Sequence, residues 1–198
     1  MSRVLLVDDE PGVLKALKRV LTRVPCRHDG ITYRLQVDQA ELPEQALELI
    51  NGHAYDLILS DFRMPGMDGV QLLKRARAIQ PGAARMILSG YADLNGVMAA
   101  INEAQIVRFL CKPWSDYELV AAIAQALAYR ALLLENQRMA DLLRLQERQL
   151  TPQDYERRRL EEAEPGITSV RWADDGSLLL DDDLASQIDD GTRRPLTL

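Results

Sequence analysis

Short apolar runs alternate with longer helical patterns from residue 4 to about residue 128. The expected strands occupy residues 4–7, 33–37, 57–59, 86–88 and 107–111, and helical spacing of apolar residues follows each of the first four. Continuous apolar strands of this kind are typical of a parallel sheet covered on both faces. With right-handed crossovers, the simplest arrangement is a doubly wound α/β fold with a five-stranded parallel sheet. Residues 25–30, between the first helix and the second strand, read as a polar loop.

Polar side chains follow the expected strands at the points where they end. Asp8 and Asp9 follow the first strand, Asp61 the third, Ser89 the fourth and Lys112 the fifth. In an open α/β sheet, ligands bind outside the carboxyl ends of the strands. An Asp-Asp pair alone is usually a solvated turn or a helix cap, but these groups at successive strand ends indicate a site.

Three carboxylates that converge on a small volume repel one another unless a cation lies among them. Hard oxygen ligands of this number suit Mg²⁺, which retains several waters and recruits a phosphate oxygen. A carboxylate held beside such a cation can attack phosphorus and form an aspartyl phosphate. The Lys112 ammonium and the Ser89 hydroxyl could then hold the remaining phosphoryl oxygens.

Four short motifs carry a family resemblance. They are Val-Asp-Asp-Glu at 7–10, Asp61 with Met-Pro-Gly-Met-Asp-Gly at 64–69, Ser-Gly-Tyr at 89–91 and Lys-Pro-Trp at 112–114. Together they resemble the receiver domain of two-component response regulators over roughly residues 3–128. The resemblance implies the flavodoxin-like strand order 2-1-3-4-5. Where the family often has Ala after the switch hydroxyl, this chain has Gly90.

The resemblance also implies a role for each matching residue. Mg²⁺ would be the cofactor, and a sensor histidine kinase or phosphotransfer protein would be the phosphoryl donor. Beyond accepting and slowly losing the phosphoryl group, the chain would not be an enzyme. The implied roles are Asp8, Asp9 and Asp61 with the backbone carbonyl of Arg63 for the metal, Asp61 as phosphoacceptor, Lys112 for phosphate, Ser89 as switch hydroxyl and Phe109 as the rotating aromatic.

Two other classes of protein share parts of this pattern. Aspartate-based phosphohydrolases also form an aspartyl phosphate, but they need a second Asp two residues after the nucleophile, where this chain has Arg63. A flavin-binding module has a similar fold, but three clustered carboxylates would repel the phosphate of its cofactor. Both alternatives are therefore less favoured than the receiver.

The segment after the last expected strand contains no Gly or Pro from residue 114 to 151 and should form one long helix that projects beyond the sheet. Tyr129, Asn136, Leu143 and Leu150 recur every seven residues, and a second row holds Leu132, Met139 and Gln146. This spacing predicts a coiled coil over residues 129–150 and a parallel homodimer. The alternative is a helix that folds back against a C-terminal hairpin within a monomer.

The charge is concentrated after the long helix. Residues 151–198 hold 12 acidic and 6 basic side chains, which accounts for the whole formal charge of −6. We therefore expect three parts: a receiver at 1–128, the projecting helix at 129–150 and an acidic extension at 151–198, with a hairpin at 167–180 and a disordered tail. An acidic extension predicts neither nucleic-acid nor membrane binding, so output should run through protein contacts.

The N-terminus and the two cysteines bear on the compartment. Residues 1–7 lack a signal-peptide core, and no run approaches the ~20 apolar residues that span a bilayer. Cys26 and Cys111 offer no disulfide framework, so a reducing cytoplasm is expected.

Overall fold

A five-stranded parallel sheet forms the centre of the protein in the computed structural model, which describes residues 1–90, 104–146, 151–163, 171–172 and 178–179. The spatial order is β4-β1-β5-β6-β7, and all four pairings are parallel. The bounds are Ser2–Val7 for β1, Leu35–Ala40 for β4, Leu57–Asp61 for β5, Ala84–Gly90 for β6 and Arg108–Lys112 for β7. The predicted sheet and its strand order are confirmed.

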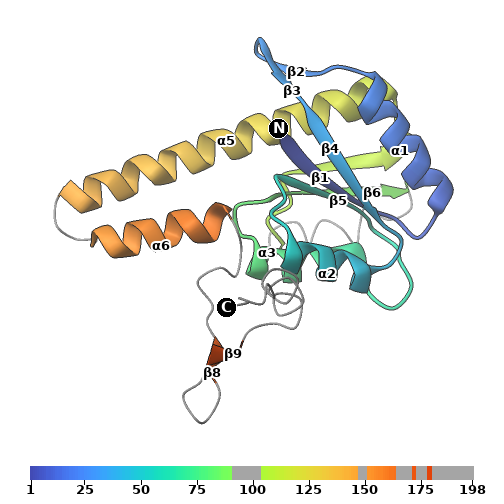
Figure 1. The fold of residues 1–198 in the computed structure, drawn as a ribbon. Coiled ribbons are helices and arrows are strands. Elements are labelled where there is room, and N and C mark those ends of the chain that lie inside the picture. Colours follow the sequence, from blue (N-terminus) through green and yellow to red (C-terminus); the bar gives the residue numbers. More distant parts are fainter. Residues whose placement is uncertain (91–103, 147–150, 164–170, 173–177, 180–198) are drawn as a thin grey trace, which may run out of the picture.

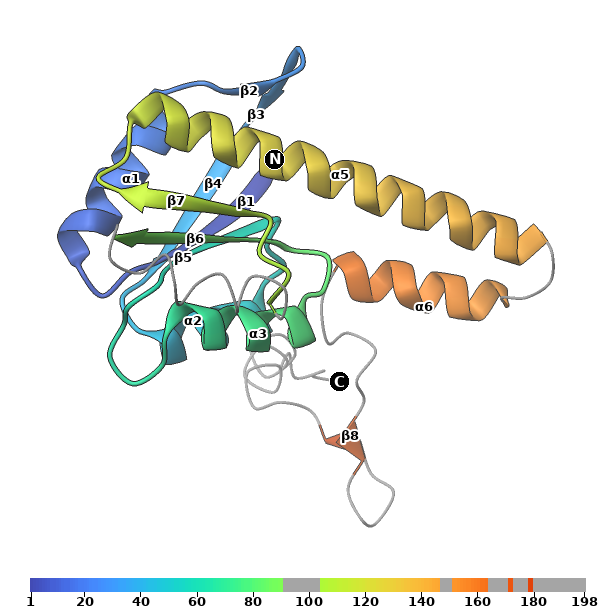
Figure 2. The same ribbon diagram turned by 180° about the vertical axis from the view of Figure 1, so that it is seen from behind.

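Helices cover both faces of this sheet (Figures 1 and 2). One face carries α1, Pro11–Arg23, and the first half of α5, Asp116–Gln146; the other carries α2, Pro43–Gly52, and α3, Gly69–Ile79. Each face has its own buried cluster, because alternate residues of every strand point to opposite sides. The helix expected between the fourth and fifth strands, up to about residue 103, lies outside the described residues.

The segment between α1 and the second sheet strand differs from the sequence prediction. Residues 25–30 are not a polar loop, because β2, Cys26–His28, and β3, Ile31–Tyr33, form an antiparallel hairpin. The sheet strand itself begins at Leu35 rather than residue 33. Asp29 and Gly30 turn the hairpin with φ of 46° and 78°, the two positive values that a tight hairpin turn needs. Cys26 is buried against α5, so the hairpin packs on that helix.

Helix α5 has two different halves. Leu119, Ile123 and Leu127 are buried in the core, whereas large apolar side chains beyond residue 128 are half exposed. A further helix, α6 (Pro152–Ala163), runs back alongside the projecting half (Figure 2). The buried carboxylate of Asp141 accepts hydrogen bonds from Arg144 and Arg158, both at 3.0 Å, and so joins the two helices.

The hairpin strands expected near residues 167–180 are short. Arg171–Trp172 forms β8 and Leu178–Leu179 forms β9, and the two strands pair antiparallel. The segment that lies beside the long helix is α6. The alternative drawn from the sequence had placed the C-terminal hairpin against the long helix.

Helix α5 is long and rich in apolar residues. By length and apolar content alone, Asp116–Leu145 could cross a membrane, which differs from the expectation drawn from the sequence. In the structure, this helix supplies Leu119, Ile123 and Leu127 to the core, and Arg130 lies within it. Packing against the sheet therefore accounts for much of its apolar content.

Candidate functional site

The parallel sheet brings the predicted polar residues to one edge. Val7 pairs with Ser60, Asp61 with Leu88, and Gly90 with Lys112, so the strands end at nearly the same level. The residue after β1 is Asp8, which therefore lies beside Asp61 on the neighbouring strand β5. This register assembles side chains that are up to 104 positions apart in the chain.

Lys112 joins two buried carboxylates at this edge. Its Nζ atom lies 2.8 Å from Asp8 Oδ2 and 2.5 Å from Asp61 Oδ1. Asp8 is only 1% exposed and Asp61 only 7%. The structure thus brings Asp8, Asp61 and Lys112 into direct contact around one nitrogen atom.

Backbone N–H groups hold the other oxygen of each carboxylate. The N–H of Glu10 donates to Asp8 Oδ1 at 3.0 Å, and the N–H of Arg63 donates to Asp61 Oδ2 at 2.7 Å. Neither donor was predicted from the sequence. The signal was present, because an Asp side chain commonly accepts from the N–H two residues later. One oxygen of each carboxylate is fixed in this way, and the other faces the shared cation.

The charges at the site are not balanced. Burial raises the pKa of Asp8 and of Asp61, although their hydrogen bonds to Lys112 act in the opposite direction. Burial lowers the pKa of Lys112, but its bonds to Asp61 and Asp8 outweigh this effect, so its pKa lies above the ordinary value. One ammonium therefore serves two buried carboxylates, and a further positive charge would be stabilised there.

The loop after Asp61 packs directly on the backbone of that residue. Gly69 donates its N–H to the carbonyl of Phe62 at 2.9 Å. A Cβ atom on Gly69 would lie 1.9 Å from the Asp61 carbonyl oxygen, so only glycine fits. Gly66 turns the loop at φ +80°, and Asp68 caps α3 by accepting from the N–H of Gln71. The motif at 64–69 therefore fixes the backbone from which Asp61 projects.

The remaining predicted residues lie around this centre. Ser89 is buried at the end of β6, and its hydroxyl donates to the Gly90 carbonyl at 3.4 Å. Phe109 on β7 is partly buried against the core beneath α2 and α3. Asp9 is exposed next to Asp8. Ser89 and Asp9 thus lie at the edge that carries Lys112, whereas Phe109 lies three residues before Lys112 on β7.

The donor set suits a hard divalent cation. Among the described residues, no three His, Cys, Asp or Glu side chains are already gathered around one point. However, oxygens of Asp8 and Asp61 both contact Lys112 Nζ, which shows that one small cation can lie between them. Mg²⁺ needs few protein oxygens because it keeps several waters. The two buried carboxylates therefore fit such an ion.

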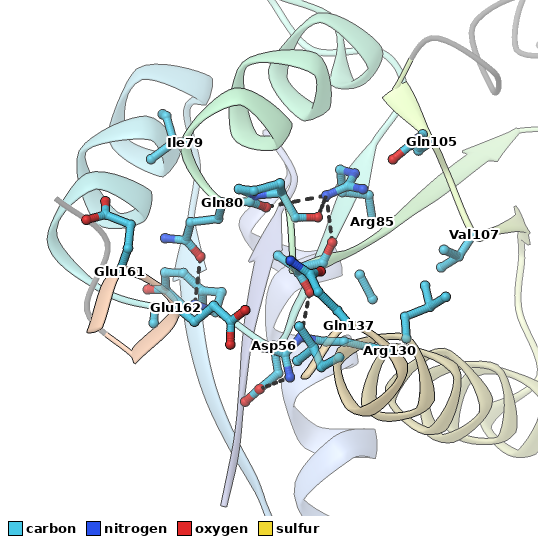
Figure 3. Close-up of a pocket in the computed structure, with 18 of the residues that line it drawn as sticks. Asp56, Ile79, Gln80, Arg85, Gln105, Val107, Arg130, Gln137, Glu161 and Glu162 are labelled. Atoms are coloured by element: carbon cyan, nitrogen blue, oxygen red, sulfur yellow. Dashed lines mark hydrogen bonds and ion pairs between the residues drawn. The ribbon is translucent and has the colours of Figure 1, made fainter. Parts of the chain in front are cut away.

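A hollow lies at the opposite end of the strands from this site (Figure 3). It encloses about 1240 Å³ between the start of β6, α5 and α6. Arg130 lies in it, 2.7 Å from Asp56 and bonded to the Gly82 carbonyl, and buried Arg85 donates to backbone carbonyls, including that of Ala104. Both arginines are therefore bonded to other groups of the protein. We interpret the hollow as a structural junction between the sheet and helices α5 and α6.

Comparison with known proteins decides the family. Residues 4–124 match the response regulator receiver domain. The chain belongs to this family. Sporulation initiation phosphotransferase F of Bacillus subtilis is 28% identical over 66% of this chain and 97% of its own length. Hydrogenase transcriptional regulatory protein HoxA of Bradyrhizobium diazoefficiens is 38% identical over 68% of this chain.

Solved structures agree with this assignment. A receiver domain of an HD domain-containing protein from Pseudomonas fluorescens is 35% identical, with a TM-score of 0.58 over 66% of this chain and 97% of that one. A chain described as adenylate cyclase from Rhodopirellula baltica is 33% identical, with a TM-score of 0.62 over 71% and 97%. The match to HoxA covers only 26% of that regulator, so the receiver spans about a quarter of such longer relatives.

Proposed function

We propose that Asp61 of this receiver accepts a phosphoryl group from a sensor histidine kinase or phosphotransfer protein. The observation that carries the proposal is the contact of Asp61 Oδ1 with Lys112 Nζ at 2.5 Å, beside buried Asp8. A nucleophilic oxygen, a second carboxylate and a fixed cation thereby occupy one edge of the sheet. This arrangement suits phosphoryl transfer, in which positioning and charge neutralisation supply most of the catalysis.

The metal would be held by Asp8, Asp9, Asp61 and the backbone carbonyl of Arg63. When bound, Mg²⁺ would neutralise charge on the phosphoryl oxygens and fix their orientation. Exposed Asp9 lies next to Asp8 and can act through a bound water, as Mg²⁺ sites commonly allow.

The chain's own residues would perform the transfer. Asp61 Oδ1 attacks phosphorus, the O–P bond forms, and the P–N bond of the donor phosphohistidine breaks with its electron pair left on the imidazole. The N–H of Arg63 holds Oδ2 and so fixes the orientation of the carboxylate, with Oδ1 towards Lys112. Lys112 then moves from the carboxylate to a phosphoryl oxygen, and the Ser89 hydroxyl donates to another.

The signal would leave the site through the strand ends that carry these groups. Ser89 and Phe109 lie on the paired strands β6 and β7, where Phe109 is opposite Ile87. A shift of Ser89 towards phosphate would open space that Phe109 can fill. Lys112 is followed after three residues by α5, which would carry the change to the projecting helix. No catalytic turnover beyond loss of the phosphoryl group is proposed.

We also propose the three-part division at 1–128, 129–150 and 151–198, with a parallel homodimer through residues 129–150. The first seam positions are exposed: Tyr129 is 51%, Leu132 55%, Met139 61% and Leu143 60% accessible. Asp141 lies two residues before Leu143, about 200° around the helix. Because Asp141 binds α6, that helix covers the face opposite the seam and leaves the seam free for a second copy.

Output would then be a change in protein contacts within the cytoplasm, without binding to nucleic acid or membranes. The acidic balance of residues 151–198 supports this proposal.

Incubation with acetyl phosphate and Mg²⁺, followed by mass spectrometry of the intact protein, tests the phosphoacceptor. We expect one phosphoryl adduct in the wild type and none in Asp61→Asn. Asp68→Asn is the matched control, because Asp68 lies in the same loop but caps α3. A stable acyl-phosphate adduct in Asp61→Asn would overturn the assignment.

A further inference from the structure

A strongly basic surface runs along α1 and the β2–β3 hairpin. Residues 15–34 hold six Lys or Arg side chains and one acidic residue, in a chain whose formal charge is −6. The core residues of α1 are Leu14, Leu17, Val20 and Leu21, so the cations of this helix lie on its outward face. We call this surface the basic face; its members are Lys15, Lys18, Arg19, Arg23, Arg27 and Arg34, and all six are exposed.

The basic face has no counter-charge within the part of the chain that the structure describes. The ion pairs there use other cations, such as Arg3 with Asp38 and Arg130 with Asp56. The one acidic residue of the hairpin, Asp29, lies 3.4 Å from His28. Six like charges without a carboxylate partner repel one another. An anionic group could therefore bind there without displacing an existing ion pair.

The same chain contains a matching anionic segment. Residues 181–190 hold five aspartates and no Lys or Arg, and they lie outside the described residues. We propose that this acidic segment docks on the basic face of its own chain. The inference is independent of the function proposed for Asp61.

The acidic segment is tethered to α6 through a connection of limited length. Helix α6 ends at Ala163, and the paired strands β8 and β9 lie between it and Asp181. The seven residues 164–170 can reach roughly 25 Å when extended, and the ten residues of the segment can extend over roughly 35 Å more. A tether that spans the distance holds its segment at an effective concentration in the millimolar range, at which weak charge pairing suffices.

Zero-length carbodiimide cross-linking of the full chain tests the contact, because it joins lysines only to carboxylates that touch them. The chain has four lysines, of which Lys15 and Lys18 lie on the basic face, whereas Lys74 is on α3 and Lys112 is at the phosphoryl site. We expect Lys15 and Lys18 to join the acidic segment at low salt. The products should disappear near 1 M salt, where the screening length is about 3 Å.

Two full-length variants sharpen this test. D181N/D182N/D183N/D189N/D190N should abolish the cross-links and shift backbone amide resonances of residues 15–34. D174N/D175N is the matched control, with two aspartates outside the segment removed, and should change neither.

Four results would overturn the proposal. They are absent cross-links with superimposable spectra, equal cross-linking of Lys74, cross-links found only between isotopically distinct copies, or a basic face that binds duplex DNA equally well with and without the five substitutions.

Discussion

Gly69→Ala is the substitution for which the structure predicts the clearest effect. The new Cβ would lie 1.9 Å from the Asp61 carbonyl oxygen and 2.9 Å from Ser60 Oγ. The 1.9 Å contact is with backbone, which cannot rotate away, so either α3 or the end of β5 must move by more than 1 Å. Overpacking of this kind destabilises a fold by about 1–3 kcal/mol, and a rigid backbone contact belongs at the upper end. That is a large part of the ~5–15 kcal/mol that holds a typical domain folded.

Urea denaturation measures this loss directly. The midpoint should fall while the slope with denaturant is unchanged, because the surface exposed on unfolding is the same. Gly12→Ala is the matched control: Gly12 lies in α1 with nothing within 4 Å of its Cβ position. That variant should be neutral or up to ~1 kcal/mol more stable, since alanine favours helix. Equal midpoints for Gly69→Ala and the wild type would refute the packing account of the loop.

Three further predictions concern other parts of the molecule. Burial raises the pKa of the Cys26 thiol from 9.0 to about 11, so its stabilising effect is complete below pH 9 and is lost as the pH rises to 11. Between these pH values, the free energy of unfolding should therefore fall by on the order of 2–3 kcal/mol more in the wild type than in Cys26→Ala. Equal falls in the two proteins would contradict this. Arg130→Met should lower the free energy of unfolding by about 1.5–3 kcal/mol and reduce hydrogen-exchange protection in the projecting half of α5. Arg138→Met should change both quantities little, because the ion pair of Arg138 with Glu162 spans 3.9 Å. Leu143→Glu should convert the proposed dimer to a monomer in light scattering, because each half-exposed seam leucine contributes on the order of 1 kcal/mol; Leu160→Glu on α6 should not, and a monomeric wild type would exclude the dimer.

The sequence predicted the sheet and the contents of its edge because parallel strands all end on the same side. Once residues 57–59 and 107–111 are recognised as strands of one parallel sheet, Asp61 and Lys112 must lie at the same edge of it. The sequence did not reveal where Lys112 Nζ lies, which is between the carboxylates of Asp8 and Asp61; its role in holding phosphate stays a prediction. That arrangement depends on burial and on distances between groups far apart in the chain.

The errors outside the site have local causes. The hairpin strands are only three residues long, too short to show an alternating pattern, although the Asp29-Gly30 turn was a usable signal. Helix α6 carries exposed charge on most sides, so its amphipathic pattern did not identify the face that meets α5. The decisive contact is between Asp141 and Arg158, a pairing that helical periodicity alone does not reveal.

Reductive trapping of the phosphorylated protein tests the central claim most directly. Borohydride converts an aspartyl phosphate, but not a free aspartate, to homoserine, and peptide mass spectrometry locates the change. After acetyl phosphate and Mg²⁺, we predict homoserine at position 61 alone, with the yield lost when the metal is chelated. Homoserine at another aspartate such as Asp8, or an unmodified position 61 in a protein that has gained a phosphoryl group, would contradict the account.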